Sequence, residues 1–205
     1  MATNEELCLG IDLGTTSIKL SLVSTTTKSL VFTTYQETNA NVSSSAGSVG
    51  AEQDVGLILS ALIVCLNRIT DTNRACIKCI CVSGQMHGIL MWNSDLPFPI
   101  VDTKQLSLFT SNLYTWEDKR ATAQLLSTLP DPDSHQLLAS GFGNVTVFWL
   151  VHNEPQTFVK YDTMGGIMDF LTCLLCGLDK PVVSHQIAAS WGYFNSTTNT
   201  WNVDM

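Results

Sequence analysis

The stretch Leu7-Cys-Leu-Gly-Ile-Asp-Leu-Gly-Thr-Thr-Ser-Ile-Lys-Leu-Ser-Leu22 decides the fold of the N-terminal part of the chain. Its first segment, Leu7 to Asp12, is a short apolar run of the kind found in buried strands. The residues Gly14 to Thr16 are typical of a turn. Apolar and polar residues then alternate from Ser17 to Leu22, which indicates a half-buried strand. The stretch therefore predicts two strands joined by a tight turn.

The residues that follow extend this pattern into an α/β domain. Leu30 to Tyr35 is a third strand candidate, so the first three strands should form an antiparallel meander. Apolar residues recur at helical spacing from Glu52 to Ile69, with Glu52 and Asp54 expected in the first turn of that helix. Ile77 to Val82 then reads as a buried strand. The order β-β-β-α-β, followed by helices, predicts an α/β domain with a mixed sheet flanked by helices.

The second part of the chain gives weaker signals. Residues 39–50 are rich in Ser, Asn and Gly and predict a loop, while residues 93–114 show no clear period. A strand is expected at 89–92, and a helix from Thr115 to Pro130, with Thr115 and Asp118 as its capping pair. Two further helices are expected at 144–152 and 168–176, and Gly177 should be the C-terminal cap of the second. The tail from Ser190 to Trp201 predicts strand and turn.

Composition excludes several classes of protein. The chain has 205 residues, 45% hydrophobic and 14% charged, which is the reverse of a disordered composition. Its 10 Lys and Arg against 18 Asp and Glu give a net charge of -8. Such a chain is poorly suited to nucleic acids or anionic membranes. The longest apolar run is about ten residues, whereas a membrane span needs about 20. The N-terminus has no apolar signal-peptide core, so we expect a cytoplasmic protein.

The seven cysteines favour free thiols, because an odd count without a secretion signal is unlike a disulfide framework. Two Cys-x-x-Cys pairs, Cys76/Cys79 and Cys173/Cys176, have the spacing of zinc ligands. Both lie in apolar strand or helix patterns rather than in tight turns. The sequence therefore favours a core role for these cysteines over a metal site.

Two segments near strand ends have the composition of ligand-binding sites. Backbone amides in the turn at Gly14, Thr15 and Thr16 can form an anion-binding nest, and Lys19 follows it. The segment is neither a Walker loop nor a dinucleotide fingerprint. Asp12 ends the first strand, where it can hold a hard cation through water. An ordinary hairpin with a solvated lysine is the alternative.

The loop Gly84-Gln85-Met86-His87-Gly88 follows the strand at 77–82, at a position where α/β sheets bind ligands. Its amide, thioether and imidazole suit a polyhydroxylated ligand, although a lone loop histidine is more often structural. Downstream, Trp116, Glu117 and Asp118 combine an indole with carboxylates, as sugar sites do. The alternative is that these acids only stabilise the first turn of a helix, where the helix dipole favours negative charge.

Taken together, these segments resemble the FGGY carbohydrate kinases, whose domains have the ribonuclease-H-like, actin-type ATPase fold. Gly10 to Lys19 is similar to the first phosphate loop of that family, and Gly84 to Gly88 to the sugar-binding loop of its ketose kinases. The resemblance covers essentially the whole chain. It also rests, in order, on Thr115-Trp-Glu-Asp-Lys-Arg120, Ser140-Gly-Phe-Gly143, Phe148-Trp-Leu150, Leu175-Cys-Gly-Leu178, Ala189-Ser-Trp-Gly-Tyr-Phe-Asn195 and Trp201-Asn-Val203.

The resemblance implies ATP-dependent phosphorylation of a ketose with Mg²⁺, with sedoheptulose as the sugar and xylulose as an alternative. It places Asp12 at the metal, and Gly14, Thr15, Thr16 and Lys19 at the phosphates. It places the sugar against Gln85, Met86, His87, Trp116, Glu117 and Asp118. Residues 1–205 would then be the N-terminal sugar-binding kinase domain, with the second, nucleotide-binding domain outside this chain.

The sequence departs from the family pattern in two respects. The general-base Asp of the family lies in a later Gly-Asp segment that does not follow Trp201, so no catalytic residue is assigned here. We therefore expect the chain alone to turn over little or no substrate. A non-catalytic sugar-binding or regulatory module is the alternative from another functional class. His185 also stands where the family shows Asp.

Overall fold

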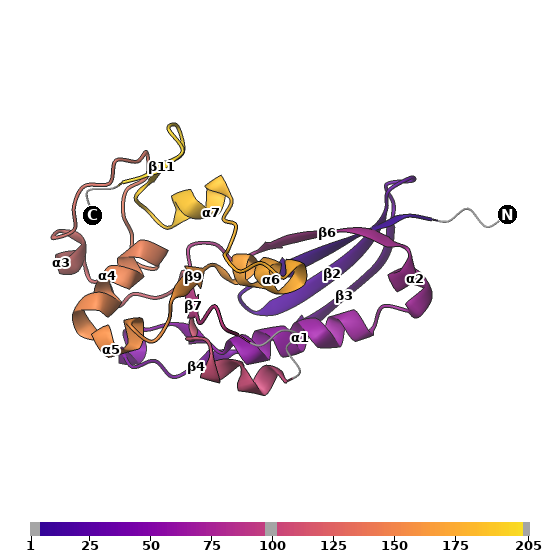
Figure 1. Cartoon of the computed structure of the whole chain (residues 1–205), viewed down its shortest axis with the longest axis horizontal. Coiled ribbons are helices and arrows are strands. Elements are labelled where there is room, and N and C mark those ends of the chain that lie inside the picture. The colour runs from indigo at the N-terminus through magenta and orange to yellow at the C-terminus, as the bar shows by residue number, and fades with distance from the viewer. Residues whose placement is uncertain (1–4, 97–101, 203–205) are drawn as a thin grey trace.

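A four-stranded mixed sheet forms one end of the molecule (Figure 1). The computed structural model describes residues 5–96 and 102–202. The strands β1 (Leu7–Leu13), β2 (Ser17–Ser24) and β3 (Leu30–Glu37) run antiparallel as a meander, and β6 (Ile77–Gly84) pairs in parallel with β1. The strand order is β3-β2-β1-β6. The predicted meander and mixed sheet are therefore confirmed.

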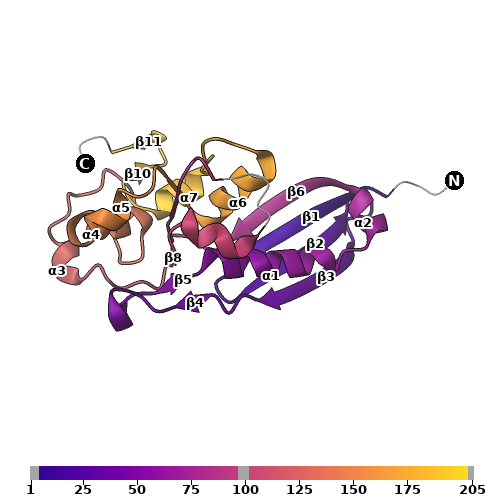
Figure 2. The ribbon, with the colours of Figure 1, turned by 60° about the horizontal axis from the view of Figure 1, so that its bottom comes forward.

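The alternation in the first two strands gives the sheet one apolar face. Every second residue of β1, from Leu7 to Leu13, is buried, as are Ile18, Leu20 and Leu22 of β2. These side chains share one core with the helices α1 (Val55–Asn67) and α6 (Ile167–Cys176). Figure 2 shows α1 lying along the strands. The opposite face, which carries Asp12 and Lys19, is open.

The start of α1 differs from the prediction. Glu52 and Gln53 are not in the helix but form β5, which pairs with β4 (Asn41–Val42) and β8 (Leu113–Tyr114). Asp54 is the N-cap, and its carboxylate accepts a hydrogen bond of 2.9 Å from the backbone N–H of Leu57. Glu52 was placed in the helix because acids are favoured in a first turn, whereas pairing with β4 and β8 buries Glu52 and Gln53 in a strand.

The other end of the molecule consists of short elements (Figure 1). Its second core is centred on Ile89, Met91, Leu150 and Trp191. The remaining elements of the chain are η1 (Gly47–Val49), α2 (Asp71–Ala75), β7 (Leu90–Trp92), η2 (Thr103–Leu108), α3 (Ala123–Leu126), α4 (Gly143–Asn153), α5 (Pro155–Phe158), β9 (Thr163–Gly165), α7 (His185–Ser190), β10 (Phe194–Asn195) and β11 (Thr200–Trp201).

Several predictions for this end are confirmed, one is wrong, and one helix was missed. The helices α4 and α6 lie where expected, and Gly177 ends α6 with a left-handed φ of 61°. The predicted helix from Thr115 to Pro130 is wrong, since the chain turns there and only α3 is helical. The short helix α7 was not expected. Residues 97–101, inside the stretch without a clear period, and Val203 lie outside the described residues.

The cysteines are all free thiols, as expected. Cys173 is buried, whereas Cys79, Cys81 and Cys176 are exposed. The core role expected for both Cys-x-x-Cys pairs is therefore wrong for Cys79 and Cys176. The expectation that β6 is buried is wrong, because β6 is an edge strand of the sheet and residues Lys78 to Cys81 are exposed on both of its faces. Within residues 5–96 and 102–202, no helix has the length and apolarity to cross a membrane.

Candidate functional site

Asp12 and Lys19 lie side by side on the open face of the sheet. They are register partners on β1 and β2, and Lys19 Nζ is 3.4 Å from Asp12 Oδ2. Both side chains remain largely exposed. They line a hollow of about 370 Å³ together with Gly10, Ser21 and other residues of β1, β2, β3 and β6. A carboxylate and an ammonium group are therefore available to one ligand on this face.

The turn between β1 and β2 is tight. The Gly14 N–H donates to the Ser17 carbonyl at 3.1 Å, and a Cβ on Gly14 would stand 2.8 Å from that oxygen. The next residue, Thr15, uses both its side chain and its carbonyl in contacts with other segments, whereas Thr16 is exposed. The turn is therefore anchored to the rest of the molecule through Thr15.

His87 is held in an unusual backbone conformation, with a φ of 68°. Its N–H donates to Ser190 Oγ at 3.3 Å, and Nδ1 lies 2.7 Å from the Ser190 carbonyl. Because a carbonyl only accepts, Nδ1 carries a proton in this contact, and Nε2 is the ring nitrogen left for a ligand. The ring also stacks on Phe142, with centroids 4.7 Å apart. These contacts fix the ring and leave Nε2 for a ligand hydroxyl.

A chain of side-chain hydrogen bonds joins the turn to the Gln85 loop. Trp116 Nε1 donates to Thr15 Oγ1 at 3.1 Å. Gln53 Nε2 donates to the Thr15 carbonyl at 2.7 Å, and Gln85 Nε2 donates to Gln53 Oε1 at 3.0 Å. We call Trp116, Thr15, Gln53 and Gln85 the relay. The relay brings together the turn at Thr15, the Gln85 loop and the segment of Trp116, which lie far apart in the sequence.

The far end of the relay carries an unused acceptor. Gln85 Oε1 is buried, and none of the described groups donates to it. A buried amide oxygen without a partner is costly and is usually satisfied by water or ligand. Met86, the next residue, is 40% exposed. The loop therefore presents polar and apolar groups of the kind expected for a hydroxylated ligand.

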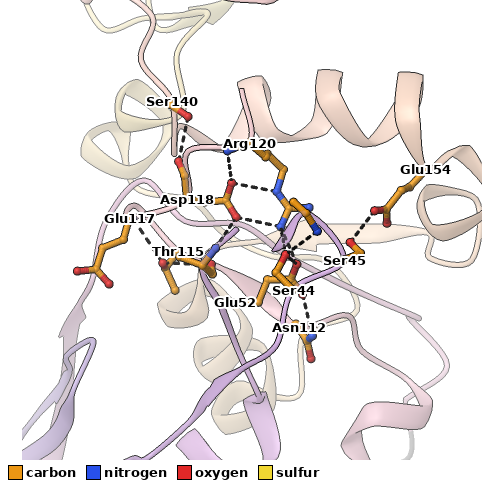
Figure 3. A network of polar contacts seen from close by, with 12 residues as sticks. Ser44, Ser45, Glu52, Asn112, Thr115, Glu117, Asp118, Arg120, Ser140 and Glu154 are labelled. Atoms are coloured by element: carbon orange, nitrogen blue, oxygen red, sulfur yellow. Dashed lines mark hydrogen bonds and ion pairs between the residues drawn. The ribbon is translucent and has the colours of Figure 1, made fainter. Parts of the chain in front are cut away.

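The three residues at 116–118 have different surroundings. Trp116 is 49% exposed, and Glu117 is exposed with its carboxylate directed away from the neighbouring polar cluster (Figure 3). Asp118 is only 1% exposed, and its carboxylate is occupied by Arg120 and the Ala51 N–H. Trp116 and Glu117 are therefore free to contact a ligand, whereas this structure gives Asp118 a structural role.

Asp118 belongs to a buried charge cluster built around Arg120 (Figure 3). Arg120 Nε and Nη2 each lie 2.9 Å from an Asp118 oxygen, and Nη2 lies 2.6 Å from Glu52 Oε1. The guanidinium is sandwiched between Tyr114 and Trp149, at 4.6 and 4.9 Å from the ring centroids. We call Glu52, Asp118 and Arg120 the charge cluster. It ties β5 to the segment that carries Trp116.

Arg120 keeps its charge despite burial. Burial alone would lower the pKa of Arg120, but hydrogen bonds and charge from Asp118 and Glu52 outweigh this and raise it. Burial, and then the charge of Glu52, raise the pKa of Tyr114. Arg120 is therefore a buried cation held by two carboxyl groups, and one of its nitrogens, Nη1, has no partner among the described groups.

Comparisons with known proteins connect this geometry to a family. The profile described as FGGY family of carbohydrate kinases, N-terminal domain, matches residues 7–205. This chain belongs to the FGGY family of carbohydrate kinases. It is 41% identical to a mouse sedoheptulokinase and 38% identical to the human one, over 96% and 97% of the chain. The chain spans only 43% and 44% of the length of those relatives.

Solved structures of sugar kinases share the fold of this FGGY domain. Plasmodium falciparum glycerol kinase with ADP has a TM-score of 0.76, with 15% identity over 98% of this chain and 40% of its own. Rhodospirillum rubrum xylulose kinase has a TM-score of 0.72, with 21% identity over 97% of this chain and 40% of its own. These likenesses show the actin-type ATPase fold that the sequence predicted.

Three residues of the FGGY domain that matter to the site were missed from sequence. Gln53 was placed in a helix, and Ser190 and Phe142 were given no role, yet they hold Gln85 and His87. Nothing local distinguishes them, because each acts across a long sequence separation. His185, which departs from the family pattern, begins α7 and lies against Phe194 with ring centroids 5.9 Å apart, which is a packing role.

Proposed function

We propose that this FGGY domain binds a ketose, with sedoheptulose as the first candidate, and works in its phosphorylation by ATP and Mg²⁺. The product would be sedoheptulose 7-phosphate. The two sedoheptulokinase relatives support this choice, because their identities of 41% and 38% exceed the 26% identity to Bacillus subtilis xylulose kinase. A kinase for xylulose is the alternative within the same class.

The relay is the observation that carries the proposal. Phosphoryl transfer is catalysed mainly by positioning and charge neutralisation, so the phosphate and the acceptor hydroxyl must be held in one frame. The relay ties the turn at Thr15 to Gln85 through Gln53. Trp116 joins the same turn from a third segment. A sugar bound by Gln85, Met86 and His87 would therefore keep a fixed position relative to phosphates at Gly14, Thr15 and Thr16.

The open face suits a metal–nucleotide complex. Mg²⁺ keeps several waters and takes one or two carboxylates together with substrate phosphates. Asp12 supplies one partly exposed carboxylate, and no group of three or more potential ligands is found in the described part of the chain. The donor set therefore fits an ion that arrives with ATP. Asp12 would hold Mg²⁺ through water and Lys19 would pair with a phosphate oxygen, and the bound ion would supply neutralisation of phosphate charge.

A direct test is calorimetric titration of the 205-residue chain with sedoheptulose, with xylulose and glycerol as controls. We expect sedoheptulose to bind more tightly than either control. ADP release with ATP and Mg²⁺ is then followed for this chain and for a form extended through a second kinase domain, and turnover is expected only in the extended form. Binding without turnover in both forms would favour the non-catalytic sugar-binding module. Absence of sedoheptulose binding would overturn the substrate assignment.

The relay itself is tested by Trp116→Phe, which keeps the ring but removes the donor to Thr15. Loss of one hydrogen bond is expected to weaken sugar binding about fivefold. Trp201→Phe is the matched control, because Trp201 is also partly exposed but lies in β11, among the rings of Phe194 and Trp191. Equal effects of the two substitutions would argue against the relay.

A further inference from the structure

Three thiols lie together on the open face of the sheet, where β1 and β6 pair. Cys8 on β1 is the register partner of Cys79 on β6, and Gly10 is the partner of Cys81. The Sγ atoms of Cys8 and Cys81 are 3.8 Å apart. Cys79 and Cys81 are exposed, and Cys8 is half-buried. We call these three residues the thiol cluster. The proposed function makes no use of them.

The cluster borders the hollow that holds Asp12 and Lys19. Cys81 lines this hollow directly, together with both charged residues. Its neighbour across the strand pair is Gly10, which has no side chain to cover the sulfur. Any group attached to Cys81 Sγ would therefore project into the space above Asp12 and Lys19. A modification of Cys81 would therefore obstruct ligand binding at Asp12 and Lys19.

The thiol of Cys8 is held in its protonated form beside Cys81. A hydrogen bond with Cys79, burial, and the proximity of Cys81 raise the pKa of Cys8 to about 12. Its Sγ lies 3.8 Å from Cys81 Sγ, so the Cys8 S–H is positioned to donate to a thiolate on Cys81. The thiolate is the nucleophile in disulfide chemistry. Cys81 also shares its hollow with the ammonium group of Lys19.

The sheet geometry disfavours a bond between the two closest sulfurs. Cys8 and Cys81 are diagonal neighbours on adjacent strands, since the register partner of Cys8 is Cys79. Diagonal residues have Cα atoms about 7–8 Å apart, whereas a disulfide needs less than about 7 Å. Oxidation of Cys81 should therefore end in a bond to an external thiol rather than to Cys8.

We propose that Cys81 is a site of thiol–disulfide exchange with low-molecular-weight disulfides, and that the adduct fills the hollow at Asp12 and Lys19. The Cys81 thiolate attacks one sulfur of the external disulfide. That S–S bond breaks, a mixed disulfide forms on Cys81, and the other half leaves as a thiolate that takes a proton from water. Blocking of phosphate binding by the adduct rests on the proposed function, whereas the exchange itself does not.

The exchange is tested by incubating the 205-residue chain with oxidised glutathione and mapping mixed disulfides by peptide mass spectrometry over time. We expect Cys81 to be modified first. Cys8→Ala, which removes the S–H beside Cys81, should slow the exchange about two- to tenfold, which corresponds to loss of one hydrogen bond. Cys176→Ser is the matched control, because Cys176 is exposed but lies on α6, outside the hollow. Cys81→Ser should abolish the fast phase.

The outcomes separate this proposal from the proposed function. Earlier modification at Cys79 or Cys176, or a Cys8–Cys79 disulfide without bound glutathione, would overturn it. A second arm repeats the reaction with Mg²⁺ and ADP present. Protection of Cys81 by ADP supports both proposals. Modification of Cys81 that ADP does not slow leaves the thiol site established and counts against a phosphate site at Lys19.

Discussion

The two ends of the molecule are stabilised in different ways. The sheet end consists mainly of the strands β1, β2, β3 and β6, of seven or eight residues each, and the helices α1 and α6, with a continuous apolar core. In the far end, strands have two or three residues and aromatic rings surround a buried ion triad that Glu52, Asp118 and Arg120 form. Long elements are specified by local periodicity, whereas short ones depend on a few tertiary contacts. The comparison therefore predicts that single substitutions act differently at the two ends.

The largest effect is expected from Arg120→Met in the charge cluster. The substitution leaves the carboxylates of Glu52 and Asp118 buried without a counter-ion, and breaking a buried pair costs about 3–5 kcal/mol. Denaturant unfolding measures the loss. Hydrogen exchange should show protection lost first in β5, β8 and α4, which surround the cluster, with the amides of β1 and β2 still protected.

Arg74→Met is the control for this substitution. Arg74 pairs with Asp71 at 3.7 Å on the surface, where such pairs contribute about 0–1 kcal/mol. Adding Glu52→Gln and Asp118→Asn to Arg120→Met should recover part of the lost stability, because the uncompensated charges are removed. Equal losses for Arg74 and Arg120 would mean that the charge cluster does not hold the far end together.

The matching experiment at the sheet end is Leu13→Ala. Leu13 ends β1 and is fully buried in the core under the sheet. Loss of its side chain leaves a cavity and should reduce stability by about 3 kcal/mol. Here we expect protection to fall throughout the chain, since α1 and α6 share this core. Leu30→Ala, at the exposed start of β3, is the control. A purely local loss of protection after Leu13→Ala would remove the distinction between the two ends.

The same distinction explains what could be predicted from sequence. The apolar run of β1 and the alternation of β2 were sufficient to place both strands and their turn. Gly177 predicted the end of α6 correctly, because a left-handed backbone at the cap favours glycine whatever the surrounding fold. Each of these features depends on residues that are close together in the sequence.

The errors fall where distant segments meet. Glu52 and Asp118 looked like acids in first helical turns, but Arg120 pairs with both and draws them out of helices. Of the candidate site residues, Gln85, Thr15 and Trp116 do come together. Gln53, which contacts both Thr15 and Gln85, was missed because the sequence does not show that β5 lies between the turn and the loop. Asp118 was expected to contact the sugar because a carboxylate accepts hydrogen bonds from hydroxyl groups, but its carboxylate is buried against Arg120.

Asp169 lies where the two ends join, and it predicts a pH effect of intermediate size. Burial raises the pKa of this carboxyl to about 6, partly offset by a hydrogen bond from the Gly166 N–H. Between about pH 4 and 6 the folded protein therefore holds a proton that the unfolded chain has released. The free energy of unfolding should fall as pH rises through this window, by about 2–3 kcal/mol, and stay at the lower level above it. Asp169→Asn should remove that fall, as measured by urea unfolding at several pH values, and parallel profiles for the two proteins would contradict the assignment.

The smallest effect on stability is expected from Lys19→Met, although Lys19 lies in the middle of the best-specified strand. Its ion-pair partner among the described residues is Asp12 at 3.4 Å, and both side chains are largely exposed, so the pair should contribute less than about 1 kcal/mol. Thermal unfolding checks this value, and titration with Mg²⁺ and ADP measures ligand affinity in the same variant. A charge-assisted contact to phosphate should lower affinity at least tenfold when removed. An unchanged affinity would show that the open face does not bind phosphate, whereas a large loss of stability would show that Lys19 belongs to the sheet rather than to a site.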